Sequence, residues 1–165
     1  MISQEFTKAL HGVYSGEQFG EAFFARLIPT AENQMQSYIL GSLLQLETEG
    51  KLVMRPLILK LGLPLADNEN AIAEGASAAQ AMVNMSWTDK FAAIVSIIRE
   101  HGLPQYEALA SMVSAEEEKA AHALAVFMGE HERIILAAAE NLVAGKKDPM
   151  APLAKFLNFP LVAPH

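Results

Sequence analysis

The sequence predicts an all-α protein, an up-and-down bundle of four main helices with short accessory helices. Apolar residues recur at intervals of three and four along most of the chain, which is the period of an amphipathic helix. Alternation at every second residue, the signature of a half-buried strand, is absent over any useful length. A chain of 165 residues can bury a sizeable core, so residues 1–165 are expected to form a single domain.

The longest helical signal runs over residues 114–145. Ser114 and Glu117 have the spacing of a capping box at its start, and Gly145 supplies a stop at its end. Six apolar residues between these signals recur at four-three spacing, namely Ala121, Leu124, Met128, Ile135, Ala138 and Leu142. Glu117 and His131 are polar residues that interrupt this seam. The pattern predicts a long helix that lies in a bundle.

Two helices are predicted in the N-terminal part of the chain. Residues 1–14 have the pattern of a short lead-in helix, which Gly12 ends. Ser15 and Gln18 form a second capping box, and the helix that starts there is closed by Pro29.

The middle of the chain carries further helical runs. Residues 31–61 are predicted as one bent helix, because Pro56 removes a backbone hydrogen bond within it. Another run starts at Asp67, and Ser86 marks a restart or a bend. The proline-rich tail, residues 148–165, is expected to pack across the bundle or against a partner chain rather than to form another long helix.

Composition and charge exclude several classes of function. Lys and Arg total 12 against 19 for Asp and Glu, and the formal charge of -7 argues against a nucleic-acid partner. Without Cys there is no disulfide and no thiolate site, so any metal would be held by Glu, Asp and His. No apolar run approaches the length of a membrane span, and the first residues lack a secretory signal, so we expect a cytoplasmic protein without a membrane partner.

Carboxylates occur where the helical pattern calls for apolar residues. Glu17, Glu47 and either Glu117 or Glu118 lie on three predicted helices, each at or near the core face. Burial of an ionised carboxylate without a partner costs several kcal/mol. These residues should therefore be paired, bound to a metal or exposed; Glu47, for example, has Lys51 four residues on as a surface partner.

The layout resembles the ferritin-like superfamily, in particular its rubrerythrin-type and aldehyde-deformylating oxygenase branches. The resemblance rests on Gly16-Glu17-Gln18, on Leu46-Glu47, and on the acidic run Glu116-Glu117-Glu118 with His122 after it. It implies an iron or manganese site with Glu17, Glu47, Glu118 and His122 as ligands.

The sequence also departs from the pattern of that superfamily. Gly50 stands where the pattern has a His three residues after Glu47, and no Glu-x-x-His occurs in the chain. The spacing points to Asp89 on the third helix, but a helical wheel places Asp89 away from the apolar face, where a capping residue belongs. The di-metal site is therefore expected to be degenerate.

Two functions follow, and whether the protein is an enzyme stays open between them. In the first, the bundle has lost a complete di-metal site and acts as an interaction or small-ligand-binding protein. In the alternative, it binds iron or manganese and performs an oxidative reaction, as an oxygenase or oxidase, or handles the metal.

A homodimer or larger homo-oligomer is also expected. Apolar residues on the helix at 114–145 extend well beyond one seam, and the tail adds further exposed apolar residues. Two-fold symmetric assembly is the commonest way to cover such surfaces.

Overall fold

A computed structural model describes residues 2–164, and these residues form helices and loops without a strand, as the periodicity predicts. Met1 and His165, the ends of the predicted domain, lie outside the described residues. The α-helices are α1 (Gln4–Leu27), α2 (Gln34–Lys60), α3 (Glu69–Met82), α4 (Trp87–Ile97), α5 (Leu103–Ser111), α6 (Lys119–Val143) and α7 (Ala151–Phe156). A 3-10 turn, Ile28–Thr30, follows α1, and a π-helical turn, Ile98–Gly102, joins α4 to α5.

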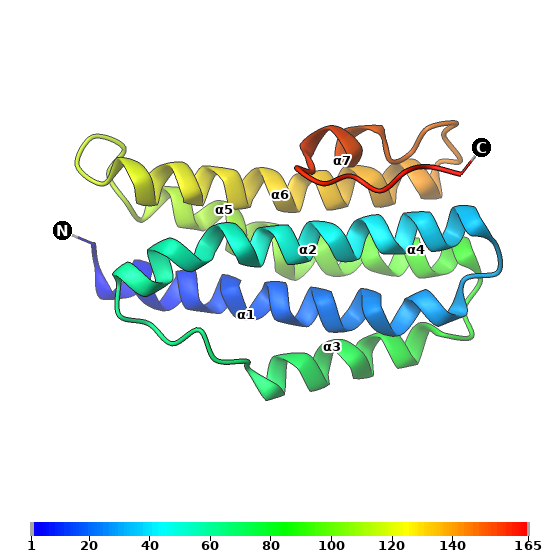
Figure 1. Cartoon of the computed structure of the whole chain (residues 1–165), viewed down its shortest axis with the longest axis horizontal. Coiled ribbons are helices and arrows are strands. Elements are labelled where there is room, and N and C mark those ends of the chain that lie inside the picture. Colours follow the sequence, from blue (N-terminus) through cyan, green and yellow to red (C-terminus); the bar gives the residue numbers. More distant parts are fainter. Residues whose placement is uncertain (1, 165) are drawn as a thin grey trace.

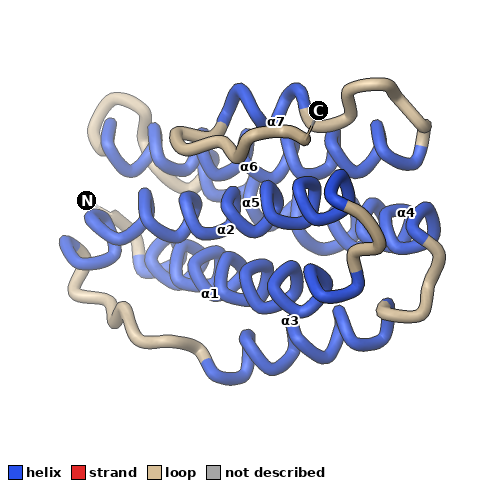
Figure 2. The backbone as a smooth tube through the Cα atoms, turned by 45° about the vertical axis from the view of Figure 1, so that its right-hand side comes forward, coloured by secondary structure: helices blue, strands red, loops and turns tan. Residues whose placement is uncertain are grey.

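Helical rods surround the core (Figure 1). They are α1, α2, α6 and the continuous rod made by α4, the π turn and α5; α1 contacts α2 and α5, and α6 contacts α2, α4 and α5. The direction of the chain alternates from helix to helix, but α3 packs on the outside of α1 (Figures 1 and 2). As a result α2 and the α4–α5 rod run in the same direction, with α3 as the crossover between them.

Side-chain caps explain where several helices begin. Ser3 accepts a hydrogen bond from the backbone N–H of Phe6, and Asn33 and Asn68 cap α2 and α3 in the same way. Ser86 accepts from the N–H of Asp89, so the predicted restart is confirmed as a true N-cap.

The helix predicted to start at Ser15 is instead the second half of α1. Nothing breaks the backbone there, because Val13 and Tyr14 pack into the core and hold the turn in helical geometry. The Ser15 hydroxyl accepts a hydrogen bond from the side chain of Asn68 instead of capping a helix. The capping-box pattern was therefore misleading, because a Ser inside a helix has the same local sequence context.

The long C-terminal helix begins later than its capping signal predicts. Ser114 accepts hydrogen bonds from the N–H groups of Glu116 and Glu117, but this turn stops short of α6, which starts at Lys119. At the other end Gly145 adopts a left-handed conformation with φ of 65°, which supports the predicted glycine stop.

The central helix α2 runs through Pro56 as predicted. Its last turns deviate from the axis of the preceding ones (Figure 1), as expected where proline removes a backbone donor.

A polar layer divides the hydrophobic core into two clusters. One cluster includes Phe24, Leu43, Phe91 and Ile135, and the other includes Phe6, Leu10, Tyr14, Met54 and Met128. On α1, α2 and α6 alike, the buried residues between the two clusters are polar or glycine. The candidate site lies in this layer.

The C-terminal tail packs across its own bundle, one of the two placements predicted for it. Leu153 and Leu157 are buried, and α7 contacts α6 and α2. Glu49 on α2 anchors the segment that follows, accepting hydrogen bonds from the N–H of Asn158 at 2.8 Å, from its side-chain amide at 2.9 Å and from the N–H of Phe159 at 2.9 Å.

The tail covers part of the apolar surface from which a dimer was predicted. Phe156 stacks on Phe127 of α6, while Phe159 and Val162 remain exposed. Homo-oligomerisation stays a prediction. Among the described helices, none is both long and apolar enough to cross a membrane.

Candidate metal centre

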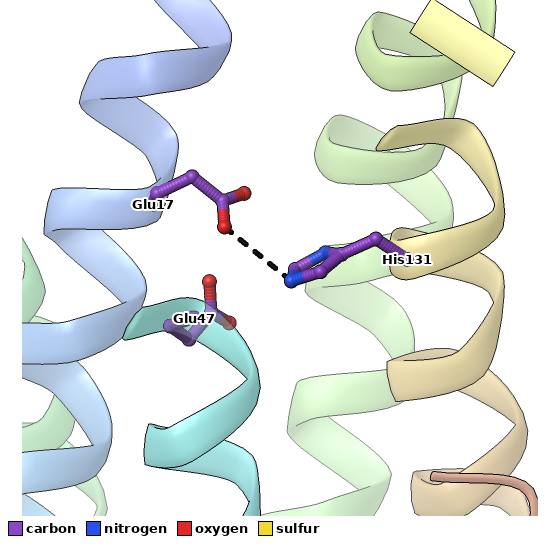
Figure 3. A group of neighbouring side chains, drawn as sticks. All are labelled: Glu17, Glu47 and His131. Atoms are coloured by element: carbon purple, nitrogen blue, oxygen red, sulfur yellow. Dashed lines mark ion pairs between the residues drawn. The ribbon is translucent and has the colours of Figure 1, made fainter. Parts of the chain in front are cut away.

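Three side chains from three helices converge in the polar layer. Glu17 of α1, Glu47 of α2 and His131 of α6 each place one potential ligand atom within 4.8 Å of the others (Figure 3). Glu17 and His131 are completely buried, and Glu47 is 5% exposed. Each residue lies where an apolar side chain would continue the core, so bundle packing itself brings them together.

The hydrogen bonds around Glu17 and His131 leave two atoms unpaired. The Tyr106 hydroxyl donates to Glu17 Oε1 at 2.7 Å. His131 Nε2 lies 3.1 Å from the Leu46 carbonyl oxygen and 3.3 Å from Glu17 Oε2. Glu17 Oε2 and His131 Nδ1 have no hydrogen-bond partner among the described residues.

Glycines provide the space that the carboxyl groups occupy. A Cβ atom on Gly50 would lie 2.0 Å from Glu17 Oε2 and 2.8 Å from His131 Nε2. A Cβ atom on Gly20 would lie 2.3 Å from the carboxyl carbon of Glu47. Both contacts are far below van der Waals distance, so these positions of the carboxyl groups and the imidazole leave no room for a Cβ atom at Gly20 or Gly50.

Burial dominates the electrostatics of the cluster. It raises the pKa values of Glu17 and Glu47 well above the usual value for Glu, even though the Tyr106 hydrogen bond opposes the shift at Glu17. Repulsion from Glu132 also raises both pKa values. Burial lowers the pKa of His131 to about 4. Without a cation, the cluster therefore favours neutral His131 and protonated carboxyl groups.

A fourth titratable group, Glu132 of α6, lies beside the cluster. It is 7% exposed, and burial raises its pKa to about 7. A Cβ atom on Gly102, the last residue of the π turn, would lie 2.0 Å from Glu132 Oε1. The π turn thus brings bare backbone against this carboxyl group, and π turns within α-helices are frequent at functional sites.

A cavity of about 600 Å³ reaches the cluster from the surface. Asn70, Glu74 and His101 line its exposed rim, and Glu47 and Glu132 lie among the buried residues of its lining. Its size is in the usual range for small-molecule sites.

The structure brings together two of the four residues expected as ligands from the sequence. Glu17 and Glu47 meet, whereas Glu118 is the N-cap residue of α6 and His122 lies in its first turn. His131 is nine residues further on, about 13 Å along the helix axis, and it supplies the imidazole instead.

The structure also decides two alternative interpretations of the sequence. Lys51 forms an ion pair with Glu21, not with Glu47, which points inward. Asp89 accepts a hydrogen bond from the hydroxyl of Ser86, the N-cap residue of α4, so it takes part in the helix cap, as the helical wheel predicted, and not in the site.

Tyr106 and Glu132 are the functional candidates that the sequence analysis missed. Tyr106 lies in the short helix α5, and its approach to Glu17 depends on the π turn before it. Glu132 follows His131 directly, and this buried polar pair in an apolar helix was the available signal.

Comparison with known protein families, with curated proteins and with solved structures gives no match. The chemistry of the site must therefore be argued from its own residues.

Proposed function

We propose that the protein binds one divalent transition-metal ion between Glu17, Glu47 and His131. The observation that carries the proposal is the convergence of three fully or almost fully buried donor groups, one of which, Glu17 Oε2, has no hydrogen-bond partner. Two carboxylates and an imidazole form a donor set that suits iron, manganese or zinc. A dication would supply the positive charge that this acidic layer lacks.

The surroundings of the cluster support one metal ion rather than two. Gly50 stands where a second imidazole ligand would be expected by resemblance to ferritin-like proteins, and the Glu17 carboxyl group occupies the space of the missing side chain. A histidine at position 50 is incompatible with this packing. We therefore propose a ferritin-like bundle in which half of a di-metal site remains.

Tyr106 would act as an outer partner of the metal ligands. Its hydroxyl holds Glu17 Oε1 at 2.7 Å and so directs Oε2 toward His131. Bound iron or manganese would supply redox chemistry near the buried part of the cavity, which is the oxidative or metal-handling activity that the resemblance implies.

Metal analysis tests the proposal directly. Protein purified without chelator, or reconstituted with ferrous iron, manganese, cobalt or zinc, should hold close to one equivalent and unfold at higher temperature than the metal-free protein. Calorimetry in two buffers of different ionisation enthalpy should detect proton release on binding, since the ligands must lose their protons. Binding below about a tenth of an equivalent for all four metals would contradict the proposal.

Paired variants distinguish the ligands that converge in the structure from the ligands expected by resemblance. His131→Gln should abolish binding, whereas His122→Gln on the same helix should retain it. In the same way, Glu47→Gln should abolish metal binding, whereas Glu118→Gln should retain it. Loss of binding in the His122 and Glu118 variants, with retention in the others, would refute the assignment.

A second function, small-ligand binding without a metal, is favoured by the cavity. It combines an exposed rim with buried carboxyl groups, as a binding site for a small polar or charged group would require. This is the expected role of a bundle that has lost its complete di-metal site. Saturable stabilisation of metal-free protein by a small molecule would support it.

A further inference from the structure

We infer that the cavity binds a small primary amine, with an apolar body between α1, α3 and α4 and a cationic head group at Glu47 and Glu132. The inference rests on the proposed small-ligand function of the cavity and does not require a bound metal.

The walls of the cavity favour an apolar body for the ligand. Phe19 and Phe23 of α1 and Ile94 and Ile97 of α4 line it, and together they form an aromatic and aliphatic surface. Burial of a hydrocarbon chain against such side chains supplies affinity in proportion to the apolar area that is covered.

The buried carboxyl groups of the cavity lack partners. Glu47 and Glu132 are 5% and 7% exposed, and neither has a hydrogen bond to any residue within 2–164. Their oxygen atoms, unlike Glu17 Oε2, are open to the cavity, so a ligand there can reach them. A primary ammonium group carries three donors, enough to reach both carboxyl groups with charge-assisted hydrogen bonds.

The remaining charges of the cavity select against an anionic head group. Among the described residues that line it, none is Lys or Arg, and Glu74 at the rim adds another carboxylate. His101, also at the rim, is the one side chain of the described lining that can carry a positive charge. An anion would therefore find no Lys or Arg to pair with in the described lining, whereas an ammonium group could donate to the carboxyl groups and pair with them once they lose their protons.

Three ligands with the same six-carbon chain and different head groups test the inference, namely hexylamine, 1-hexanol and hexanoate. Their dissociation constants are measured at neutral pH by calorimetry on chelator-treated full-length protein. Hexylamine should bind at least about tenfold more tightly than 1-hexanol, and hexanoate should bind most weakly. Because the chain is constant, the ratios report the head-group preference.

The outcomes distinguish this inference from the functions proposed above. If 1-hexanol or hexanoate binds as tightly as hexylamine, the amine assignment fails although the cavity still binds small molecules. If none of the three binds, both the amine assignment and the small-ligand function are refuted, while the metal proposal is unaffected.

Two variants locate the head group. Glu132→Gln should reduce the preference for hexylamine over 1-hexanol severalfold. Glu140→Gln, on the same helix in an exposed pair with Arg99, should leave all three constants unchanged. An unaltered amine preference in folded Glu132→Gln protein would overturn the assignment. If that variant does not fold, the comparison of the three ligands on the wild-type protein still decides the question.

Discussion

Substitution of Gly50 by Ala tests whether the Glu17 carboxyl group and His131 occupy the positions described. The added Cβ would lie 2.0 Å from Glu17 Oε2 and 2.8 Å from His131 Nε2, and neither side chain has solvent to move into. Overpacking of this kind costs about 1–3 kcal/mol. Alanine is also the better helix former, by about 1 kcal/mol. The net expectation is a loss of up to about 2 kcal/mol in the free energy of unfolding, together with loss of metal binding.

Gly12→Ala is the matched control for this substitution. Gly12 is an exposed residue inside α1, and a Cβ there would meet nothing within 4 Å. This variant should gain about 1 kcal/mol from helix propensity alone. Guanidinium unfolding of both variants, with chelator present, gives the difference between them. Equal stabilisation by the two substitutions would refute the reasoning, because it would mean that the space beside Gly50 is empty.

Five further measurements test other parts of the structure. Burial raises the pKa of Glu132 from 4.5 to about 7, so its stabilising protonated state is lost as the pH rises through this range. The free energy of unfolding of metal-free wild-type protein should therefore fall by about 3 kcal/mol relative to that of Glu132→Gln between these pH values. Parallel pH dependences of the two proteins would contradict this. Burial lowers the pKa of His131 from 6.5 to about 4, so over that window stability should rise with pH relative to His131→Gln. Tyr106→Phe removes the hydrogen bond to Glu17 and should weaken metal binding about tenfold or more, measured by calorimetry. Glu49→Ala should expose the C-terminal tail to limited proteolysis, because it removes the hydrogen bonds that hold the tail. Sedimentation of the wild-type protein at micromolar concentration should give a species larger than the 17.9 kDa monomer if the predicted dimer forms.

The helical class could be predicted from the sequence because its signals are local. The three-four period of apolar residues and the Ser86 cap depend on residues within one or two turns, and the structure retains both. The continuity of α1 through Ser15 depends instead on the packing of Val13 and Tyr14 against other helices. A capping pattern carries no information about that tertiary contact.

The candidate site was only half predictable for a related reason. Glu17 and Glu47 stand out as carboxylates on apolar helix faces, and that anomaly is visible in each helix alone. Which imidazole meets them depends on how far α6 is shifted along its axis relative to α1 and α2. His122 and His131 both lie on α6, and packing of the two core clusters selects His131.

The π turn makes the length of the chain, as well as its side chains, part of the site. Such a turn holds one residue more than the α-helix would, so conversion of residues 98–102 to α-helical geometry without a deletion would rotate α5 by about 100°. Tyr106 would then turn away from Glu17, although every residue of the site was still encoded. A related sequence one residue shorter here could follow a regular α-helix and still present the phenol to Glu17. A gap of one residue in an alignment at this point would therefore mark the loss of the π turn and not of the site.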